Sequence, residues 1–137
     1  MREILFRGKD IYGKWFYGDL INLTKEIKEI CNHTQLEHAH SVNTETVGQY
    51  TGLTDKNGTK IFEGDIILFE DESPTNYEYH DCTEMRCGEI KFDDGQFYLT
   101  NRIAVEMGDL IYDGTLEGEV IGNIHDNPEL LKECEGK

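Results

Sequence analysis

The stretch from Val47 to Glu70, VGQYTGLTDKNGTKIFEGDIILFE, constrains the fold more than any other part of the chain. Its short apolar runs are separated by Asn57-Gly58 and by Glu63-Gly64-Asp65. Asn-Gly tolerates the positive φ angles that a tight hairpin needs. The run Ile66–Phe69 is apolar without alternation, which is typical of a strand buried on both faces. A buried helix segment is the alternative, and the bracketing turns and the short length of the run argue against it.

The same punctuation recurs along the rest of the chain. Trp15–Ile21 reads as a strand, Gly88–Phe92 and Gln96–Leu99 as a hairpin about Asp93-Asp94-Gly95, and Glu119–Ile124 as the last strand. Short strands at roughly 8–12-residue spacing are typical of all-β barrels and sandwiches. We therefore predict an all-β fold.

Three segments carry weaker signals. In the segment Thr24–Ser41, Ile27 and Ile30 fit helical spacing with the preceding Leu23. The neighbouring hairpins and the lack of strong caps instead favour a strand at Ile27–Cys31, followed by a loop over Gln35–His40. Tyr77–Arg86 reads as a long loop or an irregular excursion, and Ile103–Met107 alternates like a strand.

The last residues carry helix signals, unlike the strand segments before them. Asn127 suits a helix N-cap, Pro128 the first helical position, and Glu129 the positive end of the helix dipole. The expected organisation is an aromatic-rich N-terminal β-sheet over residues 1–42, a barrel region over 47–124, and a short C-terminal helix and tail over 125–137, with a single domain as the alternative.

The net charge limits which classes of partner the chain is expected to bind. The 137 residues include 28 acidic and 13 basic ones, a formal net charge of −15. Because binding a phosphate backbone needs many lysines and arginines, a generic nucleic-acid binder is disfavoured. The acidity favours solubility, or a surface for a basic partner or one that imitates nucleic acid. No apolar run approaches the ~18 residues of a membrane span, so no membrane association is expected.

The four cysteines follow no recognised framework. With no signal peptide, a reducing, cytoplasmic compartment is expected, with free thiols. Seven residues could supply zinc ligands, but no pair has C-x2-C spacing, so loop histidines and incidental thiols are the favoured interpretation. The metal hypothesis rests on Cys31, His33, His38, His40, His80, Cys82 and Cys87.

Three adjacent aromatic residues mark the second strand. Trp15 and Tyr17 share one face of an extended chain, and Phe16 takes the other. An aromatic core between two layers is the favoured interpretation. A stacking platform for a base or a peptide is the functional alternative.

Paired carboxylates do not point to catalysis. Glu63 with Asp65, Asp93 with Asp94, and Glu117 with Glu119 lie in or beside predicted turns, where acids are common for backbone reasons. The sequence contains no P-loop, no G-x-G-x-x-G and no G-x-S-x-G. No catalytic residue and no cofactor are therefore predicted.

Three blocks together carry a family resemblance: REILFRG…GKWFYGDLI, VGQYTGLTDKNGTKIFEGDIILF and GEVIGNIHDNPELL. They resemble the YopX family of phage and prophage proteins. The resemblance implies an all-β protein with an SH3-like barrel element, which we place within 47–124, carried by phages or prophages of low-GC bacteria. Residues 25–41 and 73–87 match no family pattern.

Together these observations predict a non-enzymatic accessory protein that acts through protein interaction or regulation inside the bacterial host. A protein partner is expected, and pairing of exposed sheet edges leaves a homo-oligomer open. Two alternatives remain. One is a metal-dependent hydrolase or nuclease that uses the histidine and cysteine loops, and the other is a barrel that binds single-stranded nucleic acid through Trp15, Phe16 and Tyr17.

Overall fold

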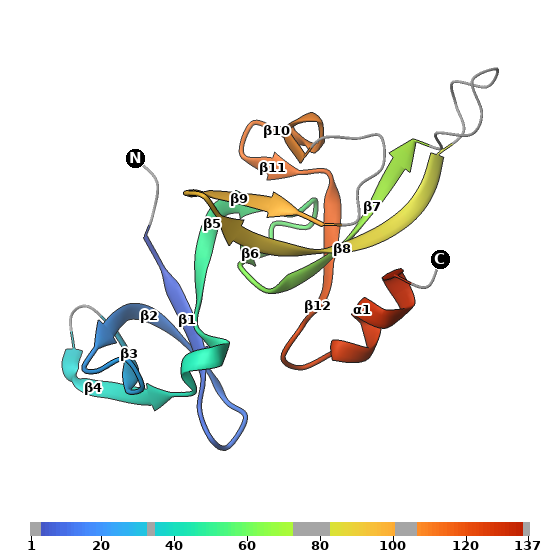
Figure 1. Ribbon diagram of the computed structural model, residues 1–137. Helices are drawn as coiled ribbons and strands as arrows, with labels where there is room; N and C mark the ends of the chain where they lie inside the picture. Colours follow the sequence, from blue (N-terminus) through green and yellow to red (C-terminus); the bar gives the residue numbers. More distant parts are fainter. Residues whose placement is uncertain (1–3, 33–34, 73–82, 101–106, 136–137) are drawn as a thin grey trace. The chain divides into compact units, whose positions relative to one another are not determined.

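The computed structural model describes residues 4–32, 35–72, 83–100 and 107–135 (Figure 1). The chain forms two compact units, Met1–Gly52 and Leu53–Lys137. The division falls inside one strand. The predicted organisation into residues 1–42, 47–124 and 125–137 stays a prediction. The elements are β1 (Phe6–Lys9), β2 (Trp15–Asn22), β3 (Lys28–Asn32), β4 (Gln35–Val42), η1 (Thr44–Thr46), β5 (Gly48–Thr54), β6 (Lys60–Phe62), β7 (Asp65–Glu72), β8 (Thr83–Asp93), β9 (Gln96–Leu99), η2 (Met107–Leu110), β10 (Ile111–Tyr112), β11 (Thr115–Leu116), β12 (Gly118–Asn123) and α1 (Pro128–Glu135).

The first unit is an antiparallel sheet in the order β5-β1-β2-β3-β4. β2 changes partners along its length: Trp15–Gly18 pair with β1, and Asp19–Asn22 pair with β3. A strand that pairs with one neighbour along its first half and with another along its second half bends the sheet, because each half keeps the direction of its own partner.

The bend brings β4 back over β1 and β2. A Cβ on Gly8 would lie 2.8 Å from a methyl group of Val42, so only glycine allows this approach. The Asn43 N–H donates to the Lys9 carbonyl at 2.8 Å, and the Lys9 N–H donates to Thr46 Oγ1 at 2.9 Å. The end of β1 is thereby fixed to the segment that follows β4.

The second unit contains the sheet β12-β7-β8-β9, which is antiparallel throughout. Ile66, Ile67 and Phe69 of β7 are buried, which confirms the prediction of a doubly covered strand. α1 packs against β8. The hydrophobic core contains Ile61, Ile67, Phe69, Ile90, Leu99, Met107, Leu110 and Leu116.

Turn chemistry explains several connections. Asp94 and Gly95 have φ angles of 50° and 78°, and Asp93 pairs with Gln96, which confirms the predicted hairpin. Asp113 and Gly114 repeat this pattern, with φ angles of 52° and 78°, between β10 and β11. At Asn57-Gly58 only the glycine has a positive φ, 85°, so that loop differs from the two-residue hairpin turn.

The strand predicted at Ile27–Cys31 is confirmed as β3, but the loop predicted over Gln35–His40 is wrong. Those residues belong to β4, which pairs with β3 through Lys28↔Val42, Glu29↔Ser41 and Ile30↔His40. The segment QLEHAH carries no apolar alternation, so the spacing of its residues does not signal the pairing with β3.

Other expectations have mixed outcomes. The excursion predicted over Tyr77–Arg86 is wrong from Thr83 onward, because Thr83–Arg86 pair with β7; residues 77–82 lie outside the described part. Met107 begins the 3-10 helix η2, while 103–106 are not described. The C-terminal helix is confirmed as α1. The all-β class is confirmed, and the SH3-like barrel within 47–124 stays a prediction.

Candidate functional site

The loop between β1 and β2 is held in one conformation by its own hydrogen bonds. The Asp10 carboxylate oxygen Oδ1 accepts from the N–H groups of Tyr12 and Lys14, both at 2.9 Å. The Asp10 N–H donates to the Lys14 carbonyl at 2.9 Å, and Gly13, with a φ of 84°, donates to the Asp10 carbonyl. The sequence DIYGK therefore forms a fixed turn.

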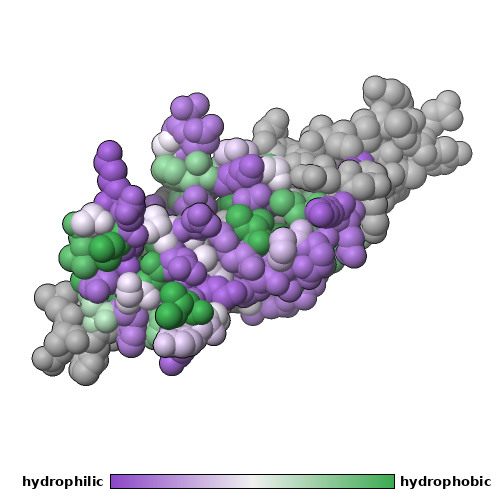
Figure 2. Space-filling view, turned by 60° about the horizontal axis from the view of Figure 1, so that its bottom comes forward, coloured by the Kyte–Doolittle hydropathy of each residue, from purple (hydrophilic) through white to green (hydrophobic). Residues whose placement is uncertain are grey.

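This fixed turn presents two large apolar side chains to solvent. Ile11 is 79% exposed and Tyr12 is 88% exposed, and further along β2 Tyr17 is 54% exposed. On the face shown in Figure 2, apolar patches are separated by hydrophilic residues. Exposed single apolar residues are common, but an apolar pair held at the tip of an ordered turn is a candidate contact surface.

Cations from β1 flank the single tryptophan. Lys9 pairs with Trp15 across the hairpin, and Arg7 pairs with Tyr17, so these four side chains share one face. The Arg7 guanidinium carbon lies 4.7 Å from the centroid of the Trp15 ring, and the Lys9 ammonium lies 5.9 Å from it. Both distances are within the range of cation–π attraction.

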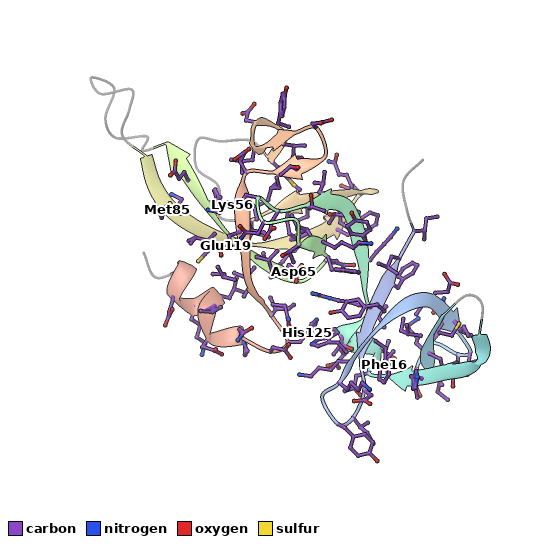
Figure 3. The ribbon with its side chains drawn as sticks, turned by 180° about the vertical axis from the view of Figure 1, so that it is seen from behind. Phe16, Lys56, Asp65, Met85, Glu119 and His125 are labelled. Atoms are coloured by element: carbon purple, nitrogen blue, oxygen red, sulfur yellow. The ribbon has the colours of Figure 1, made fainter. Side chains whose placement is uncertain are left out.

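Phe16 lies on the opposite face, and its ring also contacts other side chains (Figure 3). The imidazole of His40, from β4, stacks on its ring with 3.9 Å between centroids and 14° between planes. The Lys14 ammonium lies 5.2 Å from the same ring centroid. This contact packs β4 against β2 within the first unit.

The aromatic triplet thus neither forms a closed core nor a single platform. Trp15 and Phe16 are half-buried, and Tyr17 is exposed. Trp15 and Tyr17 do share a face, as the alternation predicted. Phe16 stacks with His40 on the other face, and binding of a base or a peptide at these rings stays a prediction.

The predicted metal ligands are distributed over both units. Cys31 is a buried free thiol in β3 of the first unit, and His40 stacks on Phe16. Cys87, in β8 of the second unit, is disulfide-bonded, so the expectation of free thiols is wrong for this residue, and a disulfide sulfur is not a thiolate ligand.

The remaining candidate ligands cannot be placed. His33, His80 and Cys82 lie outside the described residues, and His38 is described only through its backbone in β4. Within the described part of the chain, three or more metal-ligating side chains do not converge anywhere. The zinc hypothesis stays the less favoured of the two interpretations of these residues.

Asp55 is the acid with the most developed environment. Its side chain is buried, and its two carboxylate oxygens accept from the N–H groups of Asn57, Thr59 and Val120 at 2.8–2.9 Å. Burial raises the pKa of Asp55, but the hydrogen bonds from Val120, Thr59 and Asn57 and the charge of Lys56 outweigh it, so the pKa lies below its ordinary value. A general acid needs a raised pKa, which this carboxyl lacks.

Two of the acids that the sequence analysis considered also accept hydrogen bonds from backbone N–H groups. Asp65 is buried, and its Oδ2 accepts from the Phe62 N–H at 2.8 Å, which closes the β6–β7 turn. Asp93 Oδ1 accepts from the Asp94 N–H in the β8–β9 hairpin. Glu117 is exposed and Glu119 is half-buried. Figure 3 labels Asp65 and Glu119 in the second unit.

The sequence analysis found the aromatic residues of this hairpin but missed Ile11, Tyr12 and the flanking cations. An apolar pair inside a turn signal, GKDIYGK, was the available clue. The cross-strand partners of Trp15 were not visible, because they depend on the register of β1 against β2.

The fold and the hairpin define an acidic two-unit β protein whose β1–β2 turn presents apolar and cationic side chains. A model of the family described as YopX protein matches residues 5–132, and the chain belongs to that family.

Its fold is similar to that of a solved structure, the protein EF1440 from Enterococcus faecalis, with 25% sequence identity and a TM-score of 0.55 over 96% of this chain and 99% of that one. Among curated proteins none matches. In the described residues, every helix is too short or too polar to cross a bilayer.

Proposed function

We propose that this protein is a non-enzymatic interaction or regulatory module of a phage or prophage, and that it binds a protein of the bacterial host cytoplasm through the β1–β2 hairpin. The observation that carries the proposal is the fixed turn that holds Ile11 and Tyr12 at 79% and 88% exposure. A turn that is already ordered loses little conformational entropy on binding, so the energy of its contacts is available for affinity.

The use of the acids supports a role without catalysis. The carboxylates of Asp10, Asp55 and Asp65 accept backbone N–H donors that fix turns. A carboxylate that accepts such donors performs a structural task in the turn. The resemblance of the sequence to phage and prophage proteins supports an accessory role in a phage or prophage.

Site-specific photo-crosslinking tests the proposal. A photoreactive phenylalanine analogue replaces Tyr12 in the full chain, and the same analogue replaces Tyr112, which is 79% exposed in the second unit, as the matched control. Irradiation in a lysate of the bacterium that carries the gene should yield a discrete covalent adduct from position 12 only. Equal adduct patterns from both positions, or no adduct from position 12, would contradict the proposal.

A further inference from the structure

The loop between β5 and β6 contains a pair of residues, Asn57-Gly58, that can react with each other. No other asparagine of the sequence is followed by glycine. In such a pair the backbone nitrogen of the glycine can attack the side-chain amide carbon of the asparagine, because glycine has no Cβ to obstruct the approach. Both residues are exposed, and a Cβ built on Gly58 would meet nothing within 4 Å. Solvent therefore reaches this pair.

The reaction needs water as its only other reactant. The Gly58 nitrogen loses its proton and bonds to the side-chain carbon of Asn57, and the side-chain nitrogen takes up a proton and leaves as ammonia. Water then opens the resulting cyclic imide at either carbonyl, which leaves aspartate or isoaspartate at position 57. Isoaspartate continues the backbone through the former side chain and so adds a methylene group to the loop. Nothing is oxidised or reduced.

Asp55 restrains the residues on which this reaction depends. Its Oδ1 accepts from the Asn57 N–H at 2.8 Å and from the Thr59 N–H at 2.9 Å. The Gly58 N–H, whose nitrogen would attack, donates to the Asp55 carbonyl at 3.0 Å, and the Asp55 N–H donates to the Thr59 carbonyl at 2.8 Å. The attacking nitrogen must lose its proton and turn toward the Asn57 side chain, so each of these bonds opposes the reaction.

The same loop is tied to β12. The Asp55 Oδ2 accepts from the Val120 N–H at 2.9 Å, and Lys56, which is labelled in Figure 3, donates its N–H to the Gly118 carbonyl at 3.1 Å. At the neutral and alkaline pH at which the attacking nitrogen loses its proton, an aspartate is charged, and hydrogen bonds to a charged acceptor are the stronger kind. The loop is therefore held most firmly under the conditions that favour the reaction.

We propose that Asn57-Gly58 is a site of spontaneous deamidation and isoaspartate formation, and that the Asp55 carboxylate controls its rate by holding the loop closed. The sharing of one Asp55 oxygen between the N–H groups of Asn57 and Thr59 carries this inference, because the reactive bond lies between those two restrained positions. The inference goes beyond the proposed function and does not depend on it, since the β1–β2 hairpin takes no part in the reaction.

Modification would weaken the arrangement that delays it. The added methylene group displaces the N–H of position 57 relative to that of Thr59, so one oxygen of Asp55 no longer accepts from both in the present geometry. The new carboxylate also lies near that of Asp55, and like charges at short distance repel. The tie between the loop and β12 should therefore loosen, and the modified chain should unfold at a lower temperature than the unmodified one.

Incubation at mildly alkaline pH, followed by peptide mapping with mass spectrometry, measures the rate at position 57. The signal is the mass gain that accompanies replacement of an amide by an acid, which an Asp-Gly pair such as Asp94-Gly95 cannot give. Asp55→Ala removes both side-chain acceptors, and Asp55→Asn keeps one oxygen for the loop. Gly88→Ala is the matched control for general destabilisation, because it crowds the Thr100 carbonyl in the same unit and leaves this loop unchanged.

Position 57 should deamidate at least about fivefold faster in Asp55→Ala than in the parent chain, the change expected when a hydrogen bond that restrains the loop is lost. Asp55→Asn should lie between the two. Gly88→Ala should stay within about twofold of the parent chain, because the loop opens locally and not through global unfolding. A synthetic peptide of residues 53–61, which has no restraint, should react faster than the parent chain.

Equal rates in Asp55→Ala and the parent chain, equal acceleration in Asp55→Ala and Gly88→Ala, or a parent chain as fast as the peptide would each overturn control by Asp55. Absence of deamidation at position 57 from all four proteins would overturn the site itself. Circular dichroism establishes folding, and if Asp55→Ala does not fold, the rate in Asp55→Asn must exceed that of the parent chain.

The consequence for stability has its own measurement. Ion-exchange chromatography separates the modified parent chain by its additional negative charge, and enzymatic methylation of isoaspartate identifies the product. The modified chain should have a lower thermal midpoint than the unmodified chain. Equal midpoints would mean that the loop keeps its tie to β12 and would overturn the loosening inferred for the product.

Discussion

Asp55 shows how one carboxylate can join two distant parts of the sequence. Its Oδ1 accepts from Asn57 and Thr59 within the loop between β5 and β6, and its Oδ2 accepts from Val120 of β12, 65 residues away. The Lys56 N–H adds a backbone bond to the Gly118 carbonyl at 3.1 Å. The loop is thereby fixed to the edge strand of the sheet, and a charged acceptor makes these bonds stronger than neutral ones.

Replacing Asp55 should therefore be costly. Asp55→Ala leaves the Val120 N–H without its side-chain acceptor and should lower the free energy of unfolding by about 1–3 kcal/mol. Asp55→Asn keeps one oxygen for the loop and should cost less. Chemical denaturation of the three proteins gives both values. Equal stability of the parent chain and Asp55→Ala would contradict the role assigned to this carboxylate.

The same carboxylate makes stability depend on pH. Its pKa in the folded protein is lowered, whereas an unfolded aspartate titrates at about 3.9. The contribution is therefore complete above the unfolded pKa and is lost as pH falls through the folded pKa. The stability difference between the parent chain and Asp55→Asn should be constant near neutral pH and shrink below about pH 4. Denaturant titrations at several pH values measure this difference, and growth of the difference on acidification would contradict the assignment.

At the level of single residues, the sequence indicated turn positions better than it indicated contacts. Asp94 and Gly95 form the predicted turn because the φ angles that they tolerate are a local property. The stacking of Phe16 on His40 depends on how the sheet bends, and the approach of Arg7 to Trp15 depends on register. Neither is encoded in the spacing of residues along one strand.

The pairing of strands depends on glycines that allow close approach. A Cβ on Gly88 of β8 would lie 2.1 Å from the Thr100 carbonyl oxygen, a backbone atom that cannot rotate away. The same region is joined by the Thr100 N–H to the Glu89 carbonyl and by the Glu89 N–H to Thr100 Oγ1. The end of β9 therefore lies too close to β8 for any other residue at position 88.

Gly88→Ala should accordingly destabilise the second unit by about 1–3 kcal/mol, the usual cost of forcing extra volume into a packed site. Gly108→Ala is the matched control, because a Cβ there meets nothing within 4 Å, and it should stay within about 0.5 kcal/mol of the parent chain. Thermal and denaturant unfolding compare the two variants. Similar stability of both would mean that β8 and β9 are not packed as described.

The β1–β2 turn gives a prediction that separates order from charge. Asp10→Asn and Asp10→Ala remove the same negative charge, but only asparagine keeps an Oδ1 that can accept from Tyr12 and Lys14. If preorganisation of the turn matters, the photoreactive analogue at position 12 should give its adduct as efficiently in Asp10→Asn as in the parent chain and less efficiently in Asp10→Ala. The yield of adduct per protein measures this difference, and equal yields from the two variants would remove the argument from order.

The elements themselves were predictable where turn chemistry and apolar pattern agreed. Gly88–Leu99 formed the predicted hairpin, and α1 began at Pro128 after the expected cap position. In the structure the Asn127 side chain instead accepts from the Asn123 N–H at 3.3 Å. β4 was missed because a polar strand gains its stability from pairing with β3 and leaves no periodic signal.

At the scale of the whole molecule, the dominant physical property is the excess of 15 negative charges. This excess was fully available from composition, and the all-β class was available from the spacing of short strands and turn signals. The division at residues 52 and 53 was not, because β5 contributes to both units and no linker composition marks the boundary. Sequence patterns locate a boundary where a linker separates two units, but here the division lies within a continuous strand.

The charge excess predicts how the folded chain responds to salt. Repulsion among like charges destabilises the compact state relative to the expanded one, and salt screens that repulsion over about 8 Å at physiological ionic strength. The thermal midpoint should therefore rise as monovalent salt is added at neutral pH. Lys91→Glu with Lys132→Glu makes the chain more acidic, so this variant should begin at a lower midpoint and gain more from salt.

Differential scanning calorimetry across a salt series measures both effects. Sucrose, which is uncharged, is the control, because it stabilises compact states without screening and should raise both proteins equally. A midpoint that falls with salt would mean that specific ion pairs, and not the overall excess, govern the electrostatics.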